Sequence, residues 1–369
     1  MPQSGPLFRP TTLPTALDRF ILEMVDHHPT DIALITAETY HLSLPTVTHQ
    51  LTALLASGAL LCDTHDGSPR YRPAVLSYTS VMVPLQPSIE AQEIWYRYLR
   101  PVLHHYPPHI TQPATDGITH SLKNVLDHAH SRSVAITIRE TIATITITIA
   151  DHGIGLFNKI QSACHGLDLR TAALELIKGK LTTDPARHRG EGIAVTARLF
   201  DEFELQSDGY CCGHAVPLTP EQGSGQWYWH QHPTPRPIGT SVRLRLHTAR
   251  PLDEIVPASR WFTTPKDLST TLIPVVMLAE GATPFQTRRE AQRLLARIDQ
   301  FKRVVLDFQG VLVIGPEFAD EVFRVYPQQF PDIHFHWSGE NASVQAVIQD
   351  ALNADRAHPY RHHDDAFDF

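Results

Sequence analysis

The stretch Asp151-His152-Gly153-Ile154-Gly155 comes directly after two segments in which apolar and polar residues alternate, 134–138 and 145–149. Alternation with a period of two predicts β-strands with one buried face, and Arg139-Glu140-Thr141 suits the turn between them. Asp151 is therefore expected where a sheet strand ends, beside glycines that let a ligand approach the backbone closely. A carboxylate there can accept hydrogen bonds from an exocyclic amine, although so short a motif also fits an ordinary turn.

A helical pattern precedes the two strands and carries a row of polar side chains. Its apolar positions are Ile118, Leu122, Val125 and Leu126. His120, Asn124 and His128 are spaced four residues apart, so that they share another face of the helix. The sequence therefore predicts a polar helix face near the end of the strands.

Downstream, Arg189-Gly190-Glu191-Gly192 opens a second helical pattern, with apolar residues at Ile193, Val195, Leu199 and Phe200. Glycines at a helix N-terminus expose backbone N–H groups to an anion, and the helix dipole favours negative charge there. A polar helix face, a carboxylate–glycine turn and a glycine-rich helix start together predict a nucleotide pocket.

These three motifs, in this order, resemble those of the GHKL ATPase family. That family groups gyrase, heat-shock chaperone and mismatch-repair ATPases with histidine kinases and anti-sigma-factor kinases. The stretch around Asn124 resembles its N box, 151–155 its first glycine box and 189–192 its second. The resemblance spans roughly 90–248 and is closest to a bacterial subgroup with a similar Lys-Gly-Lys-Leu-Thr-Thr-Asp-Pro stretch, here 178–185.

The resemblance implies a Bergerat-type α/β sandwich over 89–249 that binds ATP and Mg²⁺. It implies that Asp151 accepts the adenine amine, that Gly153 and Gly155 admit the base, and that Asn124 is the metal ligand. It assigns Asp127 to water or hydrogen bonds near the adenine, and 178–185 to a lid over the triphosphate. The residues that it places around the phosphate tail are Lys180, Arg189, Gly190 and Gly192.

His120 departs from the pattern of the family's hydrolysing members, which carry Glu four residues before the Asn of the N box. A neutral imidazole can act as a general base near neutral pH, so His120 is the candidate catalytic residue. Histidine kinases usually have Asn at this place and do not use it to activate water. The alternative is a polar helix residue in a site that binds ATP but hydrolyses it slowly.

The first part of the chain, 14–80, predicts three helices and a hairpin and resembles a winged helix-turn-helix domain. DNA binding would place the side chains of the third helix in the major groove, and Arg70 and Arg72 on the wing. The groove-facing residues would be Thr46, Thr48, His49 and Thr52. Residues 1–80 carry four cationic side chains against seven acidic ones, which gives −3 and leaves few phosphate contacts. A winged helix that binds protein is the alternative.

The remaining segments of the first two thirds of the chain are predicted as linkers, a helix and irregular regions, without a proposed functional site. The proline-rich start, 1–14, is expected to be poorly ordered, 81–88 reads as a linker, and a helix is expected over 89–106. The stretch 217–238 is rich in Pro, Gly, Trp and His and reads as an irregular insertion without assigned chemistry. A second linker is expected over 251–266.

The last third predicts a β-α-β-α order over 269–353, which implies a small α/β sheet. Thr287-Arg288-Arg289-Glu290 is a capping-box signature for its first helix. This part resembles a STAS-like domain, the fold of anti-sigma-factor antagonists, and could bind a protein partner. Many antagonists carry a phosphorylatable serine where this chain has Gly315-Pro316-Glu317-Phe318, without a hydroxyl. The His- and Asp-rich tail, 354–369, is expected to be disordered.

The whole chain has 369 residues and a net charge of −8, enough for two or three domains and without a bulk signal for nucleic acid. Four cysteines without a paired spacing and the absence of a long apolar run predict a cytoplasmic protein without a membrane segment, possible as a homodimer. The expectation is a multidomain α+β and α/β protein that uses ATP to regulate transcription or signalling. The alternatives are a protein kinase of the histidine-kinase or anti-sigma type, and an interaction scaffold.

Overall fold

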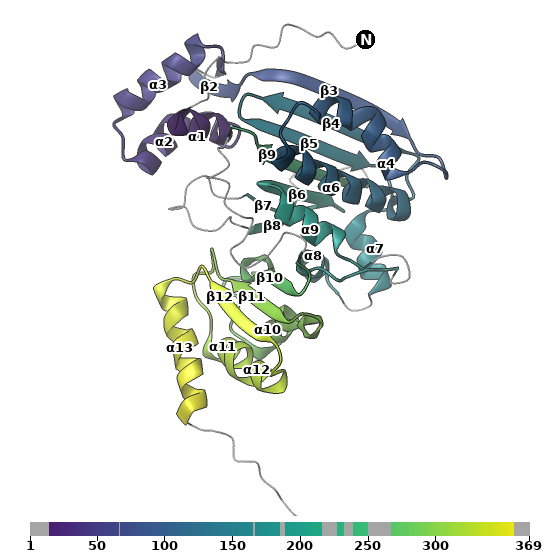
Figure 1. Cartoon of the computed structure of the whole chain (residues 1–369). Coiled ribbons are helices and arrows are strands. Elements are labelled where there is room, and N and C mark those ends of the chain that lie inside the picture. The colour runs from purple at the N-terminus through teal and green to yellow at the C-terminus, as the bar shows by residue number, and fades with distance from the viewer. Residues whose placement is uncertain are drawn as a thin grey trace, which may run out of the picture.

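The computed structural model describes residues 15–65, 67–164, 167–184, 189–215, 227–231, 239–249 and 267–357. The chain forms three parts, which Figure 1 shows in order of colour: a helical N-terminal part, a central part built on a large sheet, and a smaller C-terminal part. The predicted segments 1–14 and 251–266, and the tail beyond 357, lie outside the described residues.

The N-terminal part consists of three helices and a hairpin, as predicted. Their bounds are α1 Ala16–Met24, α2 Ile32–Tyr40, α3 Leu44–Ala56, β1 Leu60–His65 and β2 Ser68–Pro73. Thr15 and Asp18 form a capping box that starts α1, and Ser43 caps α3 with a proline in its first turn. Apolar residues of α1 and α3, among them Ile21, Val47 and Leu51, form a small separate core.

The central part is built on a seven-stranded antiparallel sheet with the order β3-β4-β5-β9-β6-β7-β8. The strands are β3 Val75–Pro84, β4 Ser133–Thr141, β5 Thr144–Asp151, β6 Glu202–Ser207, β7 Tyr210–Ala215, β8 Trp227–Gln231 and β9 Thr240–His247. Burial alternates along β4 and β5, as the period of two predicted. Asp151 is the last residue of β5, as expected.

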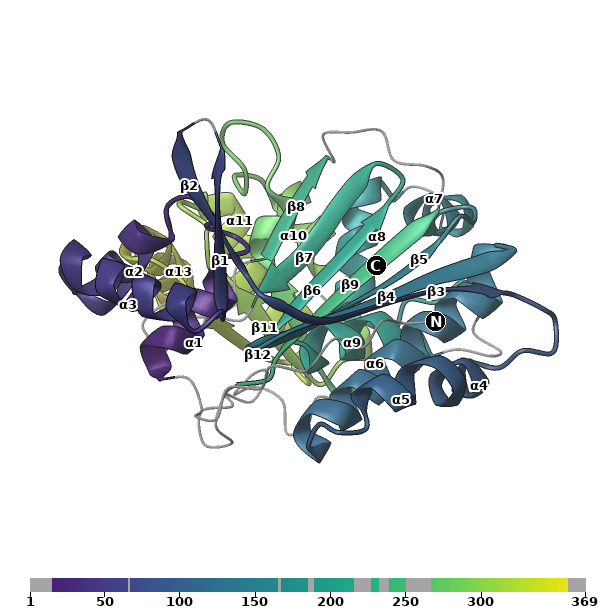
Figure 2. The ribbon, with the colours of Figure 1, turned by 90° about the horizontal axis from the view of Figure 1, so that it is seen from above.

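Helices of the central part lie along one face of this sheet, as Figure 2 shows. They are α4 Ala91–Ile94, α5 Arg100–Leu103, α6 Pro108–Asn124, α7 Leu156–Ala163, α8 Leu169–Lys178 and α9 Gly192–Leu199. A π-helical turn, Trp95–Leu99, joins α4 to α5, and a second one, Val125–Ala129, continues α6. The apolar faces of α6 and α9 pack on β5, β9 and β6 and bury the main core between helices and sheet.

Three predictions for this part need correction. The linker predicted over 81–88 is a strand as far as Pro84, because β3 is an edge strand, and an edge strand tolerates a proline that donates no ladder hydrogen bond. The predicted turn at 139–141 belongs to β4, where the buried Glu140 accepts a hydrogen bond from Ser77, and the turn lies at Ile142-Ala143. The predicted insertion 217–238 contains β8, which has the sequence Trp-Tyr-Trp-His-Gln and pairs antiparallel with β7.

The C-terminal part has a three-stranded parallel sheet with the order β10-β11-β12, as the β-α-β-α pattern predicted. Its elements are β10 Thr270–Pro274, α10 Arg288–Leu295, β11 Arg303–Asp307, α11 Pro316–Asp320, a π-helical turn Glu321–Val325, α12 Tyr326–Gln329, β12 His334–Ser338 and α13 Ala342–Ala357. The Thr287–Glu290 capping box starts α10.

Two irregular connections and the end of the last helix complete this part. Strand β10 ends at Pro274, and the apolar residues that follow it, Val275–Leu278, form a 3-10 helix. The apolar segment 311–314 is irregular and leads into α11. Helix α13 continues to Ala357, past the predicted start of the tail at 354. Among the described residues, no helix has the length and apolar character needed to span a bilayer.

Candidate functional site

Two adjacent cavities lie between α6, α7, α9 and the sheet. The first is a narrow slot of about 40 Å³ bordered by β5, β6 and β9, and the second is a larger cavity of about 480 Å³ bounded by the segment after α8 and the start of α9. The residues that line both are Asn124, His128, Leu156, Lys159 and Ile193. Because these walls are shared, the slot and the larger cavity are adjacent, and we treat them as one candidate site.

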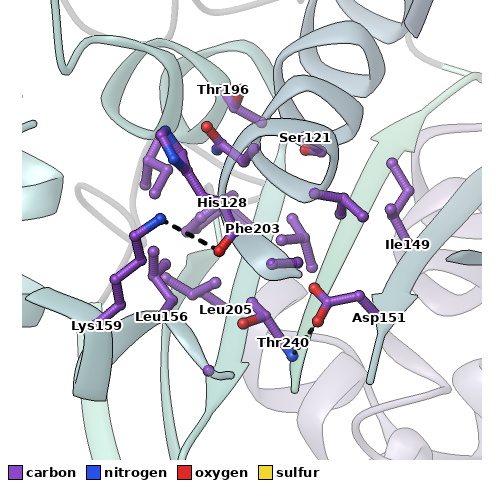
Figure 3. Close-up of a pocket in the computed structure, with 16 residues that line it drawn as sticks. Ser121, His128, Ile149, Asp151, Leu156, Lys159, Thr196, Phe203, Leu205 and Thr240 are labelled. Atoms are coloured by element: carbon purple, nitrogen blue, oxygen red, sulfur yellow. Dashed lines mark hydrogen bonds between the residues drawn. The ribbon is translucent and has the colours of Figure 1, made fainter. Parts of the chain in front are cut away.

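Asp151 places a carboxylate in the mostly apolar slot, as Figure 3 shows. The apolar walls are formed by Val125, Ala129, Ile149, Phe203, Leu205 and Val242. The Asp151 carboxylate accepts hydrogen bonds from the N–H groups of Gly153, at 2.7 Å, and Thr240, at 3.3 Å. Burial raises the pKa of this side chain, which is 7% exposed, although both backbone donors act to lower it. The slot therefore holds one strong acceptor with remaining capacity for a ligand donor.

The glycines of the 151–155 turn are needed for different reasons. A Cβ at Gly153 would overlap the Ala129 carbonyl, which accepts a hydrogen bond from the Ile154 N–H at 3.0 Å. Gly153 thus packs the turn against the end of the helix and does not line the slot. Gly155 lines it, has φ of +83° and would overlap Asp208 if it carried a Cβ. Of the two glycines predicted to admit the base, the structure brings only Gly155 to the cavity wall.

Thr196, on α9, supplies a second polar group to the slot. Its hydroxyl is buried and has no hydrogen-bond partner among the described residues, and Figure 3 shows it on the wall across from Asp151. A buried hydroxyl without a partner costs about 1–3 kcal/mol, so a polar ligand that reached Thr196 would recover that free energy. The sequence reading missed Thr196 because its spacing on α9 looks like that of a core residue.

The larger cavity carries positive charge. Its lining includes three cationic side chains, Lys123, Lys159 and Arg189, against one acidic side chain, Glu191. Lys159, on α7, donates to the carbonyl oxygen of His128 at 3.2 Å, and burial lowers its pKa while Asp184 and Asp127 oppose that shift. The first turn of α9 adds backbone N–H groups at Gly192. A cavity with this lining suits an anion such as a phosphate chain.

The glycines of the 189–192 motif allow a close approach at this cavity. Gly190 has φ of +74°, and a Cβ there would overlap the backbone of Leu181. Gly192 packs directly beside His120, since a Cβ on Gly192 would lie 3.6 Å from the Cβ of His120, which is van der Waals contact. Asn124 follows His120 by one helical turn, as predicted, so His120, Asn124 and the 189–192 segment share one cavity.

The structure does not bring Lys180 and Asp127 into the lining of either cavity. The Lys180 ammonium donates to the carbonyl oxygen of Gln300 and lies 4.4 Å from the ring centroid of Phe301, both in the C-terminal part. Asp127 is exposed and has an electrostatic effect on Lys159. Lys159 was missed because its contact with His128 joins residues 31 positions apart.

A magnesium ion can be tested against the donor atoms at this site. Asn124 lies where slot and cavity meet and offers an amide oxygen, a ligand type that this hard cation accepts. No group of three or more His, Cys, Asp or Glu side chains suited to a metal occurs among the described residues. Mg²⁺ therefore fits here only together with ligand oxygens, such as those of phosphates, and water.

Comparison with known families identifies one segment of the chain. Residues 290–345, from α10 into α13, match the family described as a STAS-like domain of unknown function (DUF4325). No curated protein matches the chain. The C-terminal part therefore contains a STAS-like domain, as the sequence predicted, and the functions of the other two parts are argued from their geometry.

Proposed function

We propose that the central part is a GHKL-type ATP-binding domain, and that the chain is a regulatory protein in which bound ATP and Mg²⁺ control the contacts of a winged-helix part and the STAS-like domain. One observation carries the proposal: a buried carboxylate, Asp151, lies in a mostly apolar slot that adjoins a cation-lined cavity. A purine is flat and apolar with an amine at its edge, and a triphosphate is strongly anionic. The two cavities match these two halves.

In the proposed complex the base enters the slot and donates its amine hydrogen to Asp151, while the Thr196 hydroxyl reaches another polar edge of the ligand. The phosphates lie in the larger cavity against Lys159, Arg189 and the first turn of α9. The slot, at about 40 Å³, is too narrow for a purine, so binding must separate α9 from the sheet or displace side chains. Asn124 would hold Mg²⁺ beside the phosphates.

His120 is the proposed general base, because it lines the larger cavity, where the phosphates are proposed to lie, next to the start of α9. Replacing His120 with Ala is expected to lower ATP turnover by about 10²-fold, the lower end of what a positioned base contributes, without changing ATP affinity. Single-turnover kinetics and calorimetry measure the two quantities. His104→Ala, which removes an exposed histidine from the end of α5, is the matched control. Equal turnover of both variants would make His120 a spectator.

Incubation of the whole chain with γ-labelled ATP separates the proposed activities. Phosphate release would indicate an ATPase, and neither release nor transfer would indicate a nucleotide sensor. Label on a partner protein would favour the alternative function, a protein kinase of the histidine-kinase or anti-sigma type. Calorimetry with and without Mg²⁺ tests the binding step common to all three, and a chain that binds no adenine nucleotide contradicts the proposal.

The proposed winged helix has an exposed face on α3 but little positive charge. Thr46, Thr48, His49 and Thr52 are exposed, whereas Arg72 of the hairpin forms an ion pair with Asp63 at 2.9 Å. If this part binds DNA through Arg70 and Arg72 alone, the logarithm of the association constant should fall with the logarithm of salt concentration with a slope of about −2 per protomer. Fluorescence anisotropy over a salt series measures this slope. The absence of binding at low salt would point to a protein-binding winged helix.

A further inference from the structure

The STAS-like domain is attached to the central part mainly through α8 and the segment that follows it, 178–184, as Figure 1 shows for α8 and β10. Arg293 donates to Asp168 at 2.6 Å, and Thr271 donates to the carbonyl oxygen of Lys178 at 2.9 Å. Arg198, on α9, donates to the carbonyl oxygen of Asp267 at 2.8 Å. The same helix and segment therefore contact the STAS-like domain on one side and the larger cavity on the other.

Lys178 is the fixed point of this contact. Its side chain is 1% exposed, forms an ion pair with Glu175 at 2.5 Å and donates to the carbonyl oxygen of Ala296 at 2.9 Å. Arg297 adds a second cation at 3.4 Å from Glu175. If the Lys178 side chain moved out of this position, the buried Glu175 carboxylate would lose its closer ion-pair partner. The start of the segment is therefore held against the STAS-like domain.

Lys180, two residues later, makes contacts with the STAS-like domain that its side chain can exchange for others. Its side chain is half-buried, and its ammonium bonds the Gln300 carbonyl and lies on the Phe301 ring, while Arg297 donates to the Lys180 carbonyl at 3.3 Å. Gly179 and Lys180 both have positive φ, +91° and +64°, and Lys180 adopts this conformation without being a glycine. The backbone here is thus in a strained conformation that the contacts with the STAS-like domain maintain.

Lys180 adjoins the larger cavity through its neighbours in the chain. Glu191, which lines the cavity, acts electrostatically on Lys180, and the residues that follow Lys180, namely Leu181, Thr182 and Thr183, form part of the cavity wall. Leu268, at the start of the STAS-like domain, lines it as well. A rotation about the glycine at 179 would therefore turn the ammonium from Phe301 towards an anion in the cavity.

We propose that the STAS-like domain and the phosphate chain of the bound nucleotide compete for Lys180, so that this domain restrains the site and nucleotide binding weakens its contact with 178–184. The inference rests on the proposed function and specifies its regulation. One ammonium cannot contact Phe301 and a phosphate at once, so each contact disfavours the other. Coupling of this kind is reciprocal: the free energy by which the STAS-like domain weakens ATP binding equals the free energy by which bound ATP weakens the contact between the domain and 178–184.

The test uses the full chain and compares ATP with adenosine, which has no phosphates. Phe301→Leu removes the aromatic ring under Lys180 and keeps an apolar side chain in this buried position. We expect ATP to bind about two- to fivefold more tightly, the range that an exposed cation–π contact allows, with adenosine affinity unchanged. Arg297→Ala, which removes the bond to the Lys180 carbonyl, should act in the same direction and serves if Phe301→Leu folds poorly.

Two further variants make the result specific to Lys180. Arg288→Ala removes an arginine that pairs with Asp320 and Glu321 inside the STAS-like domain, and it should leave ATP affinity unchanged. In a Lys180→Ala background, Phe301→Leu should no longer tighten ATP binding, because the shared ammonium is gone. Hydrogen exchange in 296–303 should become faster with ATP and stay unchanged with adenosine.

The outcomes distinguish this inference from the proposed function. Adenosine binding together with unchanged or weaker ATP binding in both Phe301→Leu and Arg297→Ala overturns the inference alone. An equal gain from Phe301→Leu with and without Lys180 also overturns it. A chain that binds neither adenosine nor ATP contradicts the proposed function, and the inference with it.

Discussion

Replacing Asp151 with Asn is expected to weaken ATP binding by about a hundredfold and to leave the fold intact. The Asn oxygen can keep the two hydrogen bonds from the Gly153 and Thr240 backbones, so the end of β5 needs no rearrangement. Its amide nitrogen then faces the adenine amine. Both groups are hydrogen-bond donors, so the hydrogen bond that the amine donates to the Asp151 carboxylate is lost. A hydrogen bond to a charged group is worth about 1.5–3 kcal/mol, and about 2.7 kcal/mol corresponds to a hundredfold change in affinity.

Calorimetry with ATP measures this effect, and thermal unfolding checks that the variant is folded. Asp116→Asn, a similar change in the middle of α6 at a residue that does not line the slot, is the matched control. An Asn at 151 should also favour a base with a carbonyl in place of the amine, so inosine triphosphate should lose less affinity than ATP. Unchanged ATP affinity in Asp151→Asn would remove the adenine assignment and with it the reading of the slot.

The pH dependence of binding reports on the same carboxylate. Burial raises the pKa of Asp151 above its ordinary value of 3.8, so it takes up a proton at a higher pH than an exposed aspartate does. Because only the ionised form accepts the amine hydrogen well, ATP affinity should fall as the pH drops through this raised pKa. The Asp151→Asn variant has no such group and should lack this step.

Local sequence patterns were sufficient to predict most of the elements. Alternating isoleucines marked β4 and β5, and capping residues marked the starts of α3 and α10, because these signals depend on neighbours within a few positions. Edge strand β3 was missed because its end contains proline, and β8 because its surroundings are rich in Pro and Gly. Both strands are fixed by pairing with a distant strand, which no local pattern records.

The sequence motifs predicted which backbone segments come together at the site, but not where the long side chains point. Asp151, Asn124 and the 189–192 segment converge because each occupies the end of an element packed on the same core. The side chain of Lys180 could not be placed from its motif, since its partners Gln300 and Phe301 follow more than a hundred residues later. Long flexible side chains are directed by tertiary contacts, and Lys159, which does line the cavity, was identified only from the packing of α7.

Replacing Lys178 with Met is expected to lower the free energy of unfolding by about 3–5 kcal/mol, the cost of removing one partner of a buried ion pair. Lys178 and Glu175 are each about 1% exposed, so the change leaves a carboxylate away from water, and Arg297, at 3.4 Å, is its remaining ion-pair partner among the described residues. Denaturant midpoints should shift accordingly. Removal of the exposed Asp63–Arg72 pair by Arg72→Ala is the control and should cost less than about 1 kcal/mol.

The double replacement of Lys178 with Met and Glu175 with Leu should recover most of that loss. Burial lowers the pKa of Lys178 although Glu175 opposes the shift, which indicates that the pair does not fully offset the cost of removing the lysine from water. Two apolar side chains of similar volume avoid that cost, and such exchanges are often neutral or stabilising. If the double variant is as unstable as Lys178→Met, then the bond from Lys178 to the Ala296 carbonyl, and not the ion pair, holds the STAS-like domain on α8.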